Sequence, residues 1–342
     1  MRLIYLFFAI FSSMPAYSLT QNKLQALNII QDCNILNING DVVRSLPGKM
    51  CLFFEDGKFI SANEKRMRLY DKNYTALWTI EGHFHHQLAL SNDKKRILAF
   101  DSGKIDIKGK NKRTDRILVI SLEGKILHEQ SSDVLLKMQK LPYFDWLNSP
   151  WLKQETNTER EISHFNSIYE IPKNANDLPG SPLREGNFIV NGLTHGIFVL
   201  SPDLKKIVFH KILNTSIEHF IHDVQVTKRG NIIYFNNITA EPTQKNLYST
   251  IQEYDLLKKG VVFEFKASPE AMFFSRYCGA IQELDDDHIL FSDKFNGTYI
   301  YSRNEKKMFS TIRGTHFQNR LPVYNQSTKA QDLSLFLKNF KR

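Results

Sequence analysis

Three histidines in this chain begin short β-rich stretches. His86 begins HQLALS, His164 begins HFNSIYEI and His222 begins HDVQVT. Three imidazoles that meet at one point would bind one small ligand together, or they would hold zinc or copper as a metal site. The alternative is a purely structural role, in which each histidine begins a buried strand and is hydrogen-bonded to a neighbouring residue. Which of these applies depends on the elements that carry the three rings.

Those elements are predicted to be β-strands in a repeated unit. Residues 222–237 and 279–294 superpose without a gap, and each segment reads as strand, polar turn, strand. Two further strands follow each segment, at 250–254 and 261–266 and at 298–301 and 307–312. The same layout recurs upstream in three more units, with strands at 166–171, 187–191, 196–201 and 206–212, at 87–91, 96–102, 116–121 and 125–129, and at 50–54, 58–62, 66–70 and 76–80.

A four-stranded unit repeated around a ring predicts an all-β fold, a β-propeller of most plausibly six blades with four antiparallel strands each. Five units are visible, and a sixth would be built from the N-terminal segment and residues near 320–324. A seven-bladed ring and a pair of β-sandwiches remain alternatives. Amphipathic helices are expected only at 133–140 and 332–340.

The repeat predicts where the histidines lie. The innermost strand begins each unit, so His86, His164 and His222 would converge on one mouth of a central channel. The fourth unit has Gly279 at this place, which implies a ligand met from one side. His83 and His85 add to the metal reading, but strand alternation predicts that His85 and His86 do not both point inward.

Composition and net charge restrict the chemical class of the partner. The 342 residues are 42% hydrophobic and carry a net charge of +9, which suits a nucleic acid, an anionic glycolipid or a small anionic substrate. Residues 104–116 hold much of the excess charge. No nucleic-acid-binding motif accompanies them, so this stretch is interpreted as a solvated loop and no nucleic-acid partner is expected.

The first residues have the pattern of a secretory signal. A positive start, an apolar run at 3–11 and the Ala-Tyr-Ser sequence at 16–18 predict a signal peptide over residues 1–18, with an uncleaved anchor as the alternative. Residues 19–342 then form a single propeller domain, clearest over 50–315, in the periplasm and without a stable membrane span. Export permits a disulfide between Cys33 and Cys51, and three buried thiols are the alternative.

At this point the sequence resembles the bacterial arylsulfotransferase family. The strings HDVQVTKRGNIIYFNN, STIQEYDL, GAIQELDDDHILFSD, HHQLAL and SHFNSIYEIP carry the resemblance, which covers roughly residues 50–315. It implies an exported six-bladed propeller that moves a sulfuryl group from an aryl sulfate ester to a phenol without adenosine phosphosulfate. It also implies that His222 is the nucleophile, through a sulfohistidine, and that His86 and His164 assist.

One position departs from the family pattern. The family has an arginine late in the second strand of the blade that carries the middle histidine, and Leu193 occupies that place in this chain. A leucine offers a sulfate no charge and no donor. Candidate replacements for substrate binding are Lys294, Arg276 and His195.

The sequence therefore predicts an arylsulfotransferase-like enzyme that needs no cofactor and no metal, and whose partners are small aryl sulfates and phenols. The rival interpretation is a non-catalytic exported propeller that binds an anionic glycan or an envelope partner. The oligomeric state is left open.

Overall fold

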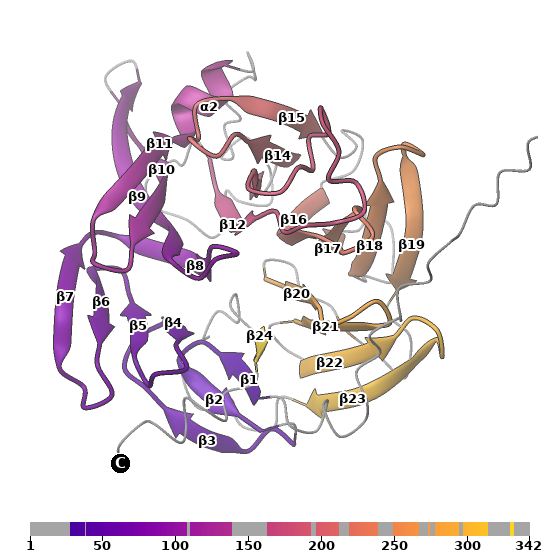
Figure 1. Cartoon of the computed structure of the whole chain (residues 1–342), viewed down its shortest axis with the longest axis horizontal. Coiled ribbons are helices and arrows are strands. Elements are labelled where there is room, and N and C mark those ends of the chain that lie inside the picture. Colours follow the sequence, from indigo (N-terminus) through magenta and orange to yellow (C-terminus); the bar gives the residue numbers. More distant parts are fainter. Residues whose placement is uncertain are drawn as a thin grey trace, which may run out of the picture.

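Six sheets of four antiparallel strands surround a common axis, like the blades of a propeller (Figure 1). The computed structural model describes residues 28–37, 39–107, 110–138, 163–192, 196–211, 219–238, 249–266, 273, 278–293, 297–313 and 329–331. The predicted all-β, six-bladed propeller is confirmed. Among these residues, no helix is long and apolar enough to cross a bilayer.

Each blade runs from an inner strand near the axis to an outer strand at the rim. In that order, blade 1 contains β24 (Lys329–Gln331), β1 (Asn28–Gln31), β2 (Asn34–Leu36) and β3 (Val42–Ser45). Blade 2 contains β4 (Met50–Phe53), β5 (Phe59–Ala62), β6 (Arg66–Tyr70) and β7 (Ala76–Glu81). Blade 3 contains β8 (Phe84–Leu90), β9 (Arg96–Ile107), β10 (Lys110–Ser121) and β11 (Ile126–Ser131).

The second half of the ring follows the same order. Blade 4 contains β12 (Phe165–Glu170), β13 (Phe188–Gly192), β14 (Gly196–Leu200) and β15 (Ile207–Lys211). Blade 5 contains β16 (His219–Val226), β17 (Ile232–Ile238), β18 (Thr250–Asp255) and β19 (Gly260–Lys266). Blade 6 contains β20 (Ala280–Glu283), β21 (His288–Ser292), β22 (Gly297–Ser302) and β23 (Lys307–Arg313).

The hydrophobic core lies between neighbouring blades. The middle strands β13, β14 and β21 are buried along their whole length, whereas the rim strands β7 and β19 alternate between exposed and half-buried side chains. Separate clusters of buried apolar side chains join blades 1 and 2, 2 and 3, 3 and 4, 4 and 5, and 5 and 6. A strand buried on both faces reads as a continuous apolar run, which is why these segments lack simple alternation.

The ring is closed by the two ends of the described chain. β24 pairs with β1 as the inner strand of blade 1 (Figure 1). The sequence predicted this type of closure but placed the C-terminal strand near 320–324. The strand is Lys329–Gln331, and residues 320–324 lie outside the described residues.

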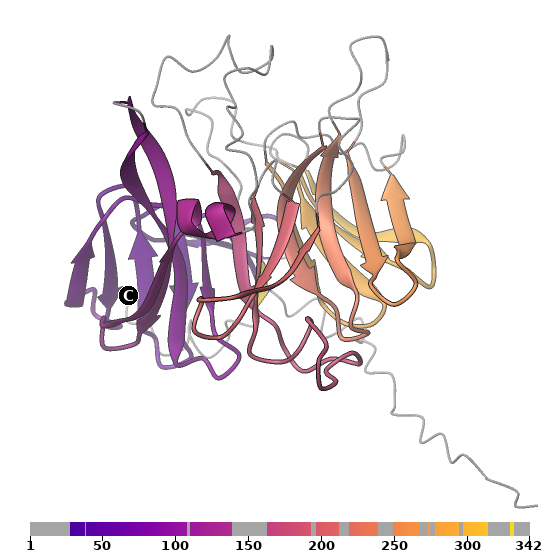
Figure 2. The same ribbon diagram turned by 90° about the horizontal axis from the view of Figure 1, so that it is seen from above.

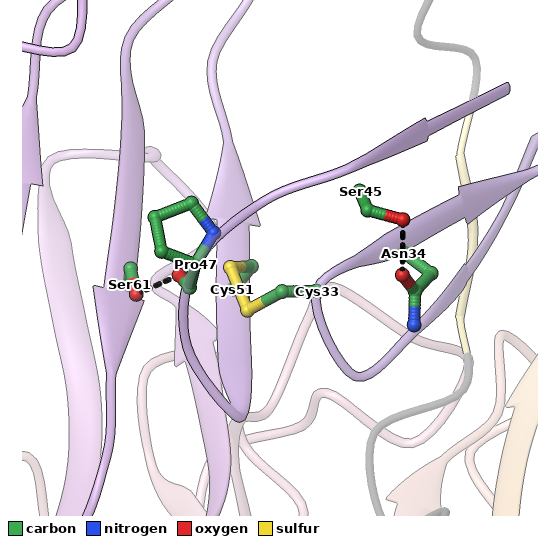
Figure 3. Close-up of a disulfide and its surroundings, with 6 residues drawn as sticks. All are labelled: Cys33, Asn34, Ser45, Pro47, Cys51 and Ser61. Atoms are coloured by element: carbon green, nitrogen blue, oxygen red, sulfur yellow. Dashed lines mark hydrogen bonds between the residues drawn. A yellow bond between two sulfur atoms is a disulfide. The ribbon is translucent and has the colours of Figure 1, made fainter.

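A disulfide crosses the seam between the first two blades. Cys33, in the β1–β2 turn of blade 1, is bonded to Cys51, on the inner strand β4 of blade 2 (Figure 3). The open question of their pairing is thus resolved, while Cys278 is a buried thiol. Gly48 has a φ of +126°, and a Cβ there would lie 3.1 Å from the Cys33 sulfur, so this approach to the disulfide needs glycine.

The basic stretch is not a loop. Residues 104–107 and 110–116 belong to β9 and β10, which pair in register from Arg96↔Ser121 to Ile107↔Lys110. This hairpin extends beyond the other strands at one end of the ring (Figure 2). The long antiparallel pairing overrides a composition that is typical of a solvated connection.

Helix α2 (Ser132–Met138) follows the rim strand of blade 3. It confirms the expected helix at 133–140, with slightly different bounds. Leu135 and Leu136 are fully buried in the cluster between blades 3 and 4. Asp133 in the first turn and Lys137 in the last turn suit the helix dipole, and their charged ends lie 3.1 Å apart. The expected helix at 332–340 lies outside the described residues.

Candidate functional site

The three histidines lie at one end of the ring. His86 is in β8, His164 directly precedes β12, and His222 is in β16. These inner strands belong to adjacent blades and start at the same end, which we call the histidine end. The β9–β10 hairpin extends past the start of β8, because Phe84 pairs with Asp101 and β9 continues to Ile107, so it projects from this end.

Each of the three inner strands has a β-bulge close to its histidine. The pairing register skips between His85 and Leu88 in blade 3, between Phe165 and Ser167 in blade 4, and between His222 and Val224 in blade 5. His86 and Asp223 have φ angles of +63° and +58°, which side chains other than glycine seldom adopt. A bulge re-aims the side chains around it and is frequent beside functional sites.

Hydrogen bonds between blades show which positions are truly equivalent. In three consecutive interfaces, a side-chain oxygen of one inner strand accepts a bond from a backbone N–H of the next. The pairs are Gln87 with Ile168 (3.3 Å), Ser167 with Val224 (3.0 Å) and Asp223 with Ile281 (2.8 Å).

On that alignment His86, Asn166, His222 and Gly279 are equivalent, and His164 stands two residues before its expected place. The prediction of three histidines at one repeat position is therefore wrong in detail.

The histidines nevertheless meet. His86 and His164 lie with their Nε2 atoms 2.8 Å apart and their rings almost perpendicular. His85 also contacts His86, through the Nδ1 atoms of both rings. The two rings touch although His85 and His86 are consecutive in β8, because the bulge turns the backbone between them, and His85 is directed at Asp115 on β10.

The row of rings ends at a buried carboxylate. His85 Nε2 lies 3.1 Å from Asp115 Oδ1, and both side chains are nearly inaccessible to solvent. The other oxygen of Asp115 accepts bonds from the Phe165 amide (2.8 Å) and the Ser163 hydroxyl (3.0 Å). We call Asp115, His85, His86 and His164 the histidine chain.

His222 has a separate partner. Its Nδ1 lies 2.6 Å from Asn237 Oδ1, and Asn237 Nδ2 donates to the Cys278 carbonyl at 2.9 Å. The second bond fixes the orientation of the amide, so an oxygen faces His222 and Nδ1 must donate. A neutral His222 then carries its lone pair on Nε2, the atom that would attack an electrophile.

The surroundings keep two of the imidazoles neutral. Burial lowers the pKa of His222 to about 3; the bond to Asn237 opposes this shift and the nearby His164 adds to it. Burial also lowers the pKa of His86 well below its ordinary value, and His164, His85, Arg113 and His222 disfavour a charge there as well. The charges of Arg113 and His222 therefore act on His86.

Blade 4 holds the backbone on both sides of His222. The carbonyl of Ile221 accepts bonds from Asn166 Nδ2 (3.2 Å) and Asn191 Nδ2 (2.6 Å), and the amide of Val224 donates to Ser167. These three polar side chains are buried. The bulge at His222 is thus supported by a neighbouring blade, which is how a strained backbone persists.

Gly279 has a packing role. A Cβ at this position would lie 2.4 Å from the ring of Phe235, the residue that pairs with His222. Gly279 therefore leaves room for the ring of Phe235, which lies opposite His222 in the neighbouring strand. Its presence does not need the explanation that a ligand is met from one side.

The predicted substrate-binding residues Lys294, Arg276 and His195 lie outside the described residues, as does Leu193. Gly192 and Gly196, which flank residues 193–195, pair with each other, and Gly192 also pairs with Phe165, next to His164. Within the described residues, Arg113 is a basic side chain whose charge acts on His86. It lies on β10, is half-buried and donates from Nε to Ser102 at 2.9 Å.

The metal reading receives no geometric support. Where the structure describes the chain, no group of three or more His, Cys, Asp or Glu side chains is arranged to hold a metal ion. A cleft lined by Asp177, Leu178, Pro179, Arg184 and Glu185 lies in the β12–β13 connection, at the end of the ring opposite the histidines.

Sequence reasoning missed Asn237 and Asp115, and it set His85 aside. Asn237 could have been found from the hairpin register, since it lies two residues beyond Phe235 and so shares a face with His222. The register also places Asp115 on the face of His85, because His85 pairs with Phe100, Phe100 pairs with Ile117, and Asp115 lies two residues from Ile117. It was missed because the basic stretch was interpreted as a loop.

The lowered pKa of His222 makes stability depend on pH. The unfolded state takes up a proton near pH 6.5 and the folded state only near pH 3, so stability is lost as the pH falls below about 6.5. At pH 5 we expect this group alone to cost about 2 kcal/mol. Urea unfolding at pH 7 and pH 5 should show that loss in the native protein and not in His222→Gln. The control is His128→Gln, which changes an exposed histidine and keeps His222, so it should still show the loss; the same loss in His222→Gln would contradict the prediction.

Comparison with known proteins shows the fold alone. No family model matches this chain, and no curated protein matches it. Among solved structures, a protein of unknown function from Bacteroides caccae is similar with a TM-score of 0.52 and 13% identity, covering 84% of this chain and 93% of that one. An oligogalacturonate lyase in complex with manganese is similar with a TM-score of 0.48 and 9% identity, covering 86% and 73%.

Proposed function

We propose that this propeller is an arylsulfotransferase-like enzyme of the periplasm, which moves a sulfuryl group from an aryl sulfate ester to a phenol through His222. The observation that carries the proposal is the bond of His222 Nδ1 to Asn237, because it leaves the lone pair on Nε2. The low pKa of His222 supports it too, since the ring stays neutral at any pH above about 4. A neutral imidazole with a fixed tautomer is a competent nucleophile.

The reaction has two halves. In the first, His222 Nε2 bonds to the sulfur, and the bond from sulfur to the aryl oxygen breaks. In the second, the phenol oxygen bonds to the same sulfur and the bond to His222 breaks, which restores the imidazole. Splitting one displacement into two steps is the advantage of a covalent intermediate.

The other histidines and Arg113 have the chemistry that this reaction needs. The leaving phenolate takes up a proton, and the incoming phenol loses one, at the His86–His164 pair. Positive charge beside the sulfuryl oxygens stabilises the transition state. Arg113 is the described cation that acts on His86, and Lys294, Arg276 and His195 stay further candidates for binding the sulfate.

A non-catalytic propeller that binds an anionic glycan or envelope partner is the second candidate. The observation that favours it is burial, because only 2% of His222 is exposed, whereas a nucleophile must reach a sulfur atom. The two candidates differ in whether His222 ever forms a bond to the ligand.

Mass analysis at neutral pH tests that difference. Incubation with a nitrophenyl sulfate and no acceptor should add one sulfuryl group to the native protein, map to His222, and release nitrophenol in equal amount. A phenol added afterwards should remove the group. His222→Ala should stay unmodified, while His128→Ala, which changes an exposed histidine on β11, should be modified like the native protein. A native protein that gains no mass with several aryl sulfates would exclude the covalent mechanism.

A further inference from the structure

The histidine chain has a fixed direction, which the Asp115 carboxylate sets. The ionised Asp115 carboxylate has no proton to give, and its Oδ1 lies 3.1 Å from His85 Nε2, so the ion pair favours a proton on Nε2 and, in the neutral ring, a lone pair on Nδ1. His86 must then donate from Nδ1 to His85 and accept at Nε2. The bond between the two Nε2 atoms is therefore donated by His164, whose accepting atom becomes Nδ1.

From this geometry we propose that the histidine chain is a directed proton relay, which takes up the phenolic proton of the acceptor at His164 and stores it on His85, beside the Asp115 carboxylate. The identity of the proton's source rests on the proposed sulfuryl transfer. The direction and the storage site rest on the Asp115–His85 ion pair and on the contacts between the rings.

Uptake of a proton moves one N–H bond at each ring. The O–H bond of the phenol breaks as an N–H bond forms at His164 Nδ1. The Nε2 proton of His164 passes to Nε2 of His86, and the Nδ1 proton of His86 passes to Nδ1 of His85. The product is an imidazolium at His85 next to an ionised carboxylate, and no electron is gained or lost.

The reverse sequence supplies the other half-reaction. A proton stored on His85 returns through His86 to His164 and protonates the phenolate that leaves the donor. The relay is thus loaded before the first half-reaction, empty in the covalent intermediate and loaded again after the second. One full transfer consumes no proton, as the overall exchange between two phenols requires.

The charges around each ring favour storage of the proton at the Asp115 end of the histidine chain. Burial of His86, and then the charges of His164, His85, Arg113 and His222, disfavour a lasting positive charge on its ring. Burial raises the pKa of the Asp115 carboxyl group. Three neighbours outweigh it and keep that pKa below the ordinary value: His85 through its hydrogen bond and charge, His164 through its charge, and the Phe165 amide. A proton stored on His85 is therefore stabilised by the adjacent Asp115 carboxylate as its counter-ion. His85 is also held in place by stacking on Phe100, with ring centroids 6.0 Å apart.

Nitrogen-15 NMR of the imidazoles tests the direction without any substrate. In the native protein at pH 8, the proton should lie on Nε2 of His85, Nδ1 of His86 and Nε2 of His164. Any other order in the native protein would overturn the relay direction. This measurement needs no variant to fold.

Asp115→Asn should reverse the chain. Oδ2 of Asp115 accepts from both Phe165 and Ser163, so an asparagine would keep its oxygen there and turn its NH₂ group toward His85. His85 would then accept at Nε2, and the protons should move to Nδ1 of His85, Nε2 of His86 and Nδ1 of His164. The matched control is Asp101→Asn, a buried aspartate on β9 that binds Arg116 and the His83 amide, and it should leave the order unchanged. Unchanged protons in Asp115→Asn would contradict the proposal.

Kinetics then separate this proposal from the proposed function. With a nitrophenyl sulfate, whose leaving group needs little protonation, Asp115→Asn should still form the adduct on His222. Transfer from a donor with a basic leaving group, and onward transfer to a phenol, should fall about 10²- to 10⁴-fold, as loss of acid–base assistance does. No adduct in any form of the protein would defeat the proposed function alone. An adduct with undiminished onward transfer in Asp115→Asn would defeat the relay alone.

Discussion

Replacing His222 with alanine is expected to lower sulfuryl transfer by about 10⁴- to 10⁶-fold, the scale on which loss of a covalent nucleophile acts. Neither His86 nor His164 is expected to take its place. His86 and His164 are hydrogen-bonded to each other through Nε2, and the position equivalent to His222 in blade 4 is Asn166. Steady-state release of nitrophenol in the presence of a phenol measures the effect.

Asn237→Leu provides the graded comparison. It keeps the approximate size of the side chain and removes the oxygen that holds Nδ1, so the ring keeps its nucleophilic atom without a fixed tautomer. We expect a loss of about 10²-fold, with the adduct still formed slowly. The histidine mechanism would be wrong if His222→Ala retained native turnover, and the tautomer argument would be wrong if Asn237→Leu did.

Loss of the disulfide is expected to have the largest effect on stability. Cys33 and Cys51 are 18 residues apart, and closing a loop of that length restricts the unfolded chain by about 3 kcal/mol. Cys33→Ala/Cys51→Ala should lower the free energy of unfolding by that amount, measured with urea under oxidising conditions. Alanine is chosen because both sulfurs are buried and a serine hydroxyl would lack a partner.

Reductant is the control for this variant. It should destabilise the native protein to the level of the double variant, and it should not change the double variant, in which Cys278 is the remaining thiol. Equal stability of the oxidised native protein and the double variant would show that the bond contributes nothing to the fold.

The architecture was readable from the sequence because a propeller repeats one local pattern. Residues 222–237 and 279–294 align without a gap, and they do form the inner hairpins of blades 5 and 6. Alternation of strands with turn residues fixes such hairpins locally. The closing strand was misplaced, since β24 has three residues and its pairing with β1 depends on the whole ring.

The site was less readable because bulges decide it. A single extra residue in an inner strand changes which side chains point to the axis, and no residue type at His86 or Asp223 announces a positive φ. This is why the rings of His85 and His86 touch although the residues are consecutive in a strand. Asp115 shares the face of His85 through the register of β8, β9 and β10, but its segment was interpreted as a loop and no such register was drawn.

The closing strand also sets the order in which the molecule is completed. β1 is synthesised long before β24, yet its inner edge waits for Lys329–Gln331. Until then blade 1 is a three-stranded sheet with an open edge, and open edges are templates for pairing with other chains. A nascent chain thus needs protection of that edge until β24 has been made. A chain cut before Lys329 would keep the edge open, and self-association would be its characteristic fate.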